Sequence, residues 1–155
     1  MKVIVIGAGE VGYHLAEHLL WDGHQVTVIE QTAERAALVR EQLAVNTIVG
    51  SGTDPNVLRQ AGAAEAGLLV ATTPHDEVNI VACELAQAMF QLPTKVARLR
   101  DSAYLTGASR EIFAPGRLAV DEIISPEIDV AQAVLRMISA PGAVESHFMG
   151  QGEIH

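Results

Sequence analysis

Three glycines near the start of the chain have the spacing of a phosphate-binding turn. Gly7, Gly9 and Gly12 form a G-x-G-x-x-G pattern directly after the β-branched run KVIVI. Between a strand and a helix, the first glycine permits a tight turn, the second a close approach of the backbone to phosphate, and the third close packing of the helix. The free amides and dipole of the helix amino terminus attract anions. The pattern therefore predicts a nucleotide site.

A single acidic residue, Glu30, ends the next β-branched run, QVTVIE. At about this distance from the glycines, an acid accepts hydrogen bonds from ribose hydroxyls. Its charge repels a 2′-phosphate, and residues 31–33, which begin with Gln31, offer no cation that would reverse this preference. We expect a ligand with an unphosphorylated adenosine ribose, bound beside Glu30 and Gln31. The alternative is a solvated carboxylate at the end of a strand.

Polar segments follow the third and fourth predicted strands, at the carboxyl edge where open parallel sheets bind ligands. GSGTDP offers Ser51 and Thr53 to an adenosine, whereas Asp54 is better placed to cap the next helix. ATTPHDEVN offers Thr72 and Thr73 to a ribose or phosphate. The acids that follow in this second segment suit the first turn of a helix equally well, where they complement the helix dipole.

Two arginines lie at the end of the fifth predicted strand. Arg98 and Arg100 in ARLR lie two residues apart, and therefore on one side of an extended chain. In a chain with only ten Lys and Arg residues, such a pair suggests a phosphate contact. The alternative is a pair of ion pairs with Asp101 or Glu122.

Two other residue sets resemble functional sites less well. HLAEH (14–18) has the H-x-x-E-H spacing of zinc sites, but it lies on the helix that begins at the phosphate turn, so we expect no metal. Cys83 lies among apolar residues without a basic neighbour in sequence. We expect it to be a buried small hydrophobe rather than a reactive thiol.

These residues must be positioned by alternating strands and helices. The alternation predicts an α/β fold with a doubly wound, parallel, six-stranded, Rossmann-like sheet. The predicted strands are 2–6, 25–30, 46–50, 67–71, 95–99 and 118–124. The predicted helices are about 10–22, 33–43, 54–61, 75–90 and 102–113.

A further helix is predicted at 126–139, opened by Pro126 and stopped by Pro141-Gly142. It is apolar on more than one face, so it either crosses over to another subunit or folds back on its own sheet. We predict a nucleotide-binding domain over 1–140 that includes this helix. Residues 141–155 are either a tail or the start of a following domain.

Composition and charge limit the classes of function. A chain of 155 residues with 49% hydrophobic residues fits one compact domain. The formal charge of −9 argues against a nucleic-acid partner. One cysteine and no charged leader favour the cytoplasm. No apolar run reaches the roughly 20 residues of a spanning helix, so we expect no direct membrane insertion.

Residues for catalysis are not found beside the predicted nucleotide site. A dehydrogenase needs a substrate site and an acid or base beside the nicotinamide, usually from a second domain, and this chain has no room for one. Neither Tyr13 nor Tyr104 is followed by a lysine four residues later. We therefore expect a protein that binds a nucleotide and is not an enzyme.

Several spaced motifs together resemble the RCK/KTN nucleotide-binding domain, the amino-terminal module of the TrkA family of Trk-type potassium uptake regulators. The resemblance implies a cytoplasmic regulatory subunit that binds NAD(H) and ATP or ADP. It also implies homodimers that assemble into a ring and gate a potassium-transporting membrane protein, peripheral to the inner face of the membrane. The motifs are MKVIVIGAGEVG, Glu30, GSGTDPNVLRQAGAAEA, ATTPHDEVNIVACELA, ARLR and DEIISPE…PGA.

The resemblance also implies roles for individual residues. The helix after Pro126 would be exchanged between subunits. Some relatives carry an arginine inside the glycine loop, where this chain has Glu10-Val11, so we do not expect the loop itself to read a γ-phosphate. The implied nucleotide contacts are Gly7, Ala8, Gly9, Glu10 and Val11 at the phosphates, Glu30 at the ribose, Ser51 and Thr53 near the adenosine, Thr73 and Pro74 along the nucleotide, and Arg98 with Arg100 at the outer phosphates.

Three functions are consistent with these residues. The first is a nucleotide sensor of a potassium uptake system. The second is the cofactor domain of an NAD-dependent oxidoreductase, and the third is a structural assembly module with a relict site. Full-length Trk regulators resemble two such domains in tandem, so we expect this chain to be a fragment or a single-module version.

Overall fold

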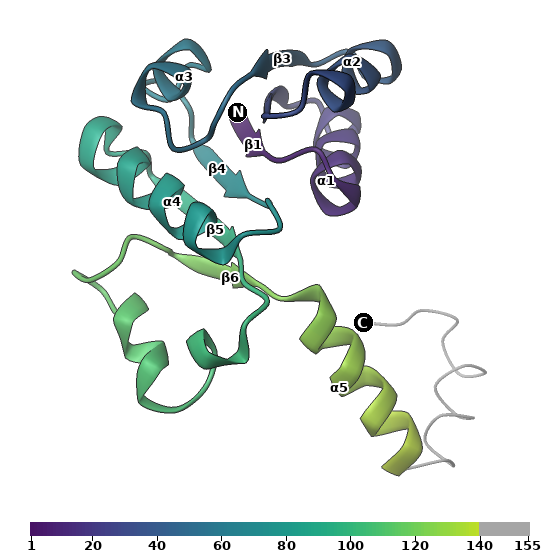
Figure 1. The fold of residues 1–155 in the computed structure, drawn as a ribbon, viewed down its shortest axis with the longest axis vertical. Coiled ribbons are helices and arrows are strands. Elements are labelled where there is room, and N and C mark those ends of the chain that lie inside the picture. Colours follow the sequence, from purple (N-terminus) through teal and green to yellow (C-terminus); the bar gives the residue numbers. More distant parts are fainter. Residues whose placement is uncertain (140–155) are drawn as a thin grey trace. The chain divides into compact units, whose positions relative to one another are not determined.

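The computed structural model describes residues 1–139. Contacts divide the chain into two compact units, Met1–Ile124 and a second unit that begins at Ser125. The first unit is an α/β layer structure with one central sheet (Figure 1). It contains every predicted nucleotide-binding residue.

The sheet has six parallel strands in the order β3-β2-β1-β4-β5-β6. This is the predicted doubly wound, Rossmann-like arrangement, and it is confirmed. The order reverses between β1 and β4, which pair from Val3–Leu68 to Ile6–Ala71. The strands are β1 (Lys2–Ile6), β2 (Gln25–Glu30), β3 (Asn46–Val49), β4 (Leu68–Ala71), β5 (Thr94–Arg98) and β6 (Glu122–Ile124).

Helices cover both faces of the sheet, as Figure 1 shows. α1 (Glu10–Trp21) and α2 (Ala33–Gln42) pack on one face, and α3 (Pro55–Gln60) and α4 (Asp76–Phe90) belong to the core on the other. Because side chains alternate along a strand, β1 contributes Val3 and Val5 to the first core and Ile4 and Ile6 to the second. Both faces of the strands are therefore buried, as parallel sheets require.

The predicted helix over 102–113 is wrong. Two short 3₁₀ helices occupy this region, η1 (Ser102–Tyr104) and η2 (Gly107–Phe113). The carboxylate of Asp101 accepts from the amide of Ala103 at 2.9 Å, which closes a short turn. Gly107 has a φ of +62°, which a continuous right-handed helix excludes. Local capping and one glycine thus override the apolar periodicity.

The predicted strand over 118–124 is too long. Only Glu122–Ile124 pairs with β5. Before it, the amide of Ala119 donates to Oε1 of Glu84 at 2.6 Å, and the amide of Val120 donates to the carbonyl of Leu118. One amide is bound by a side chain of α4 and the other by a carbonyl of the same loop, so neither is available to the sheet.

The second unit contains one described helix, α5 (Pro126–Ser139), at the predicted position. The amide of Asp129 donates to the carbonyl of Ser125 at 3.0 Å, which forms the first helical turn. Acids in the first turn and Arg136 in the last suit the helix dipole. The stop signal Pro141-Gly142 and the tail lie outside the described residues, and the domain boundary at 140 stays a prediction.

Cys83 is buried on α4, as predicted, and is fully inaccessible to solvent. Burial raises the pKa of its thiol to about 12, although the positive charge of Lys95 acts in the opposite direction. The thiol is therefore protonated throughout the neutral range.

We expect Cys83 in the folded protein not to react with an aromatic disulfide reagent between about pH 7 and 9, because the nucleophile is the thiolate. On denaturation the thiol should label fully, since its pKa returns to about 8.5. Absorbance at fixed pH, with and without denaturant, measures both states. Fast labelling of the folded protein would contradict this account.

Candidate functional site

A cleft of about 690 Å³ opens at the carboxyl edge of the sheet, at the point where the strand order reverses. Its volume is that of a cofactor site, for which roughly 300 to 1,000 Å³ is usual. The segments that follow β1, β2, β3 and β4 line it, together with the end of β5. The predicted residues that line it are Gly7, Gly9, Glu10, Val11, Glu30, Gln31, Ser51, Thr53, Thr72, Thr73, Pro74 and Arg98. Those that do not are Ala8, Gly12 and Arg100.

Gly7 and Gly12 have the turn and packing roles that the sequence predicts, and the space beside Gly9 is open. Gly7 has a φ of +92°, and its amide donates to the carbonyl of Ile29 at 2.8 Å. Gly12 packs so tightly that an added Cβ would lie 1.8 Å from the carbonyl oxygen of Gly7. At Gly9, by contrast, an added Cβ would meet no atom within 4 Å. Open space therefore lies beside Gly9, the residue that precedes α1.

Glu30 is buried, so the alternative of a solvated carboxylate is wrong. Its side chain is 4% exposed. One oxygen accepts from the amide of Ala8 at 2.9 Å, and the other accepts from the amide of Thr32 at 2.6 Å. Each carboxylate oxygen can accept a second hydrogen bond, so acceptor sites for ribose hydroxyls remain. Glu30 thus joins the glycine loop to the β2–α2 loop.

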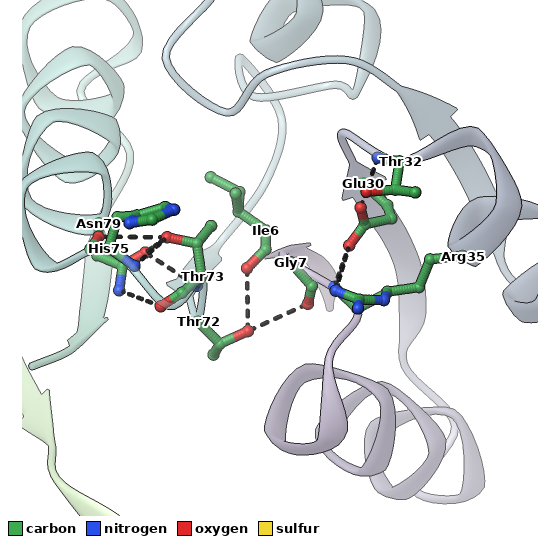
Figure 2. A network of polar contacts seen from close by, with 10 residues as sticks. Ile6, Gly7, Glu30, Thr32, Arg35, Thr72, Thr73, His75 and Asn79 are labelled. Carbon is green, nitrogen blue, oxygen red and sulfur yellow. Dashed lines mark hydrogen bonds and ion pairs between the residues drawn. The ribbon is translucent and has the colours of Figure 1, made fainter. Parts of the chain in front are cut away.

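A cation lies closer to Glu30 than the sequence indicates. Nη1 of Arg35 is 4.0 Å from Oε1 of Glu30, and Arg35 also lines the cleft (Figure 2). Residues 31–33 carry no cation, but Arg35 lies just beyond them. Because α2 begins at Ala33, its first turn brings Arg35 back toward the end of β2. The charge argument against a 2′-phosphate is correspondingly weaker.

The two threonines after β4 have different roles. Thr72 is buried, and its hydroxyl lies 2.9 Å from the carbonyl oxygen of Ile6 and 3.1 Å from that of Gly7, to which it can donate. It anchors the start of the glycine loop to β4. Thr73 is tied to Asn79 of α4, which sequence reasoning missed. Figure 2 shows this cluster and the Glu30 cluster on opposite sides of Gly7.

The loop after β3 is held by its own side chains. The hydroxyls of Ser51 and Thr53 lie 2.8 Å apart, and the amide of Thr53 donates to Ser51 Oγ at 3.1 Å. Asp54 caps α3 by accepting from the amide of Asn56 at 2.8 Å, as predicted. Gly52 was not predicted to contribute, yet an added Cβ there would lie 2.4 Å from Cγ2 of Ile6. Only glycine fits between this loop and β1.

Arg98 and Arg100 line different pockets. Arg98 is the last residue of β5 and lines the cleft, half-buried. Arg100 follows the end of the strand, where simple alternation no longer applies, and it lines a neighbouring pocket that shares Pro74 and His75 with the cleft. Its amide donates to Oδ1 of Asp76 at 2.9 Å. Of the two arginines, only Arg98 therefore lines the cleft.

The H-x-x-E-H residues lie on α1. Nδ1 of His14 is 3.7 Å from a carboxylate oxygen of Glu17, and the ring of His18 meets that of Trp21 edge-on. Within residues 1–139, no three His, Cys, Asp or Glu side chains gather in a group that could hold a metal. In the same range, no helix is both long and apolar enough to cross a membrane.

Sequence comparisons place the chain among known proteins. Residues 3–126 match the family described as the TrkA-N domain. The chain is 42% identical over 154 residues to the Trk system potassium uptake protein TrkA of Azorhizobium caulinodans, covering 99% of this chain and 34% of the relative. Identity to the protein of the same name from Halomonas elongata is 43% over 145 residues, covering 94% and 31%. The chain spans about a third of the length of these relatives.

Solved structures share the fold. The TrkA-N domain of the inner membrane protein ybaL from Escherichia coli superimposes with a TM-score of 0.74 at 21% identity, covering 88% of this chain and 95% of that one. The GsuK channel bound to NAD superimposes with a TM-score of 0.65 at 20% identity, covering 81% and 21%. GsuK bound to ADP also gives 0.65, at 19% identity, covering 80% and 31%.

Proposed function

This chain belongs to the TrkA-N domain family, and we propose that it is the nucleotide-sensing module of a regulatory subunit in a Trk-type potassium uptake system. The observation that carries the proposal is the cleft at the strand-order reversal, where the glycine loop, Glu30 and Arg98 line one space. These three features suit phosphate, ribose hydroxyls and an outer phosphate, respectively. The relatives named above are potassium uptake proteins, which supports the transport system.

The proposed ligands are NAD(H) and ATP or ADP, bound at one site. The open space at Gly9 admits a phosphate to the amino terminus of α1, where Gly9 contributes no capping side chain. Glu30 retains acceptor sites for ribose hydroxyls beside its bonds to the two loops. The NAD and ADP complexes of GsuK, which has the same fold, support this ligand class.

Sensing requires that the ligands prefer different conformations of the assembly. A nucleotide shifts an equilibrium only by its difference in affinity for the two states. To shift the ratio of the two conformations from 1:99 to 99:1, the ligand must bind one of them more tightly by about 5.5 kcal/mol. Coupling several sites in one assembly divides this requirement among them. In the proposal, a nucleotide-binding domain over 1–140 forms homodimers through helix 126–139, and these dimers form a ring. The ring gates a potassium-transporting membrane protein from the cytoplasmic face.

The proposal assigns no catalytic step to this chain. The side chains of Glu30, Thr72 and Thr73 all hold loops in place through hydrogen bonds. The cofactor domain of an NAD-dependent oxidoreductase is the alternative that the following experiment separates.

Calorimetric titration with ATP, ADP, NAD, NADH and NADPH tests the proposed function. We expect ATP, ADP, NAD and NADH to compete for one site. Arg98→Ala should weaken ATP binding by about tenfold, the effect of one charge-assisted contact to phosphate. Arg100→Ala is the matched control, because Arg100 lies on the same chain segment but outside the cleft. It should leave ATP binding within about twofold of the unchanged protein.

Two results would contradict the proposal. Binding confined to NAD and NADH and indifferent to Arg98→Ala, with steady NADH oxidation by a small-molecule substrate, would indicate an oxidoreductase domain. No nucleotide binding at all would indicate an assembly module with a relict site. The readout for gating is the size and shape of the assembly in solution, which should differ between ATP and NADH.

A further inference from the structure

One buried side chain joins two walls of the cleft. Asn79, in the first turn of α4, has no solvent exposure. Its Oδ1 accepts from the amide of Thr73 at 3.0 Å and from the hydroxyl of Thr73 at 2.7 Å. Its Nδ2 donates to the carbonyl of Thr73 at 3.0 Å and to the carbonyl of Arg98 at 2.7 Å. Figure 2 shows the bonds to Thr73.

The chemistry of the partners fixes this arrangement. The amide of Thr73 can only donate, and the carbonyls of Thr73 and Arg98 can only accept, so the side-chain oxygen and nitrogen of Asn79 have one satisfying orientation. Each side-chain polar atom makes two hydrogen bonds. A buried network with every member satisfied holds its parts rigidly.

A neighbouring residue holds the next part of the chain. Asp76 is 8% exposed, and its two carboxylate oxygens accept from the amides of Arg100 and Asp101 at 2.9 and 2.8 Å. The first turn of α4 therefore binds the loop after β4 and the segment after β5 at the same time. Thr73 and Arg98 both line the cleft, and they reach it from different strands.

We propose that Asn79 is a positioning residue of the nucleotide site, which sets the place of Arg98 relative to Thr73 and so determines the preference for nucleotides with outer phosphates. This inference rests on the proposed function, in which Arg98 contacts an outer phosphate. Asn79 contacts the backbone of Arg98 and does not line the cleft. Its effect on the ligand is therefore transmitted through Arg98.

The test compares ATP with AMP, which lacks the outer phosphates, by calorimetry. Asn79→Asp preserves the shape and the oxygen that accepts from Thr73, but it replaces the NH₂ group that donates to the carbonyls of Thr73 and Arg98 with a second oxygen. ATP affinity should fall by about tenfold while AMP affinity changes by less than about threefold. In the Arg98→Ala background, Asn79→Asp should have no further effect on the ATP to AMP ratio, because the coupled partner is gone. Should Asn79→Asp not fold, Asn79→Ser replaces it.

A control separates positioning from loss of stability. Lys95 lies at the opposite end of β5, 4% exposed, where its Nζ donates to Gln87 and Leu92 and lies 3.1 Å from a carboxylate oxygen of Asp121. Lys95→Met disrupts this buried network and should lower the unfolding temperature without changing the ratio of ATP affinity to AMP affinity. The inference would be overturned if Asn79→Asp lowered the affinities for ATP and AMP equally, or if Lys95→Met changed the ratio of these affinities as Asn79→Asp does. The proposed function would stand in either case. Absence of nucleotide binding by the unchanged protein would overturn the inference together with the proposed function.

Discussion

Glu30→Ala is expected to abolish nucleotide binding and to destabilise the fold. The substitution removes the proposed acceptor for the ribose and leaves two amides, those of Ala8 and Thr32, without their partner. Ala8 is buried, whereas Thr32 is exposed and water can replace the bond to its amide. One unsatisfied buried donor costs about 1 to 3 kcal/mol, so the free energy of unfolding should fall by roughly that amount. Titration and thermal unfolding of the same preparation measure both effects.

Two further variants define the origin of this effect. Glu30→Gln retains the shape and one acceptor oxygen but turns an NH₂ group toward one of the two amides, so its loss of stability should be smaller. Glu34→Gln removes an exposed acid from the first turn of α2 and should change neither quantity appreciably. If Glu30→Ala bound every nucleotide as the unchanged protein does, the cleft would not be the nucleotide site.

Alanine at Gly9 and at Gly12 should separate binding from stability. At Gly12 an added Cβ would lie 1.8 Å from the carbonyl oxygen of Gly7 and 2.6 Å from Oγ1 of Thr72. Backbone must move to relieve this contact, so Gly12→Ala should cost more than about 3 kcal/mol, the usual upper range for overpacking. In a domain of this size the unfolding temperature should fall by roughly 6 to 12 °C.

Gly9→Ala should weaken nucleotide binding and leave stability nearly unchanged. No protein atom lies within 4 Å of an added Cβ, and the φ of −70° and ψ of −167° are open to any residue. Stability should change by less than about 1 kcal/mol. The methyl group would occupy the proposed phosphate position, so ATP and NADH affinity should fall by about 100-fold, or about 2.8 kcal/mol. If Gly9→Ala bound ATP and NADH with the affinity of the unchanged protein, the phosphates would not bind at this turn.

The parts of the fold that the sequence predicts are those with local signals. The six strands, the glycine turn, the Asp54 cap and the burial of Cys83 follow from periodicity, from residue type and from neighbours within a few positions. The predicted helix over 102–113 failed because Gly107 and the Asp101 turn interrupt a pattern that looks periodic. Here local turn chemistry outweighs apolar spacing.

The residues that sequence reasoning missed act over longer separations. Arg35 reaches Glu30 only because α2 begins directly after β2. Asn79 bonds to the last residue of β5 and Asp76 to the chain after it, 19 and 24 residues away, and nothing near them in sequence marks those partners. Their residue types are nevertheless informative, because a buried Asn or Asp at the start of a helix must have partners. The pairing itself requires the fold.

The strand order also determines when during synthesis the cleft can exist. β1 is made first but lies in the middle of the sheet, and its second neighbour, β4, comes only at Leu68–Ala71. Arg98 requires β5 as well, which pairs with β4. A nascent chain that ends before β5 carries the other residues that line the cleft but lacks Arg98. In the proposed function, a nucleotide with outer phosphates can therefore make its full set of contacts, and stabilise this unit through them, only after β5 has been made.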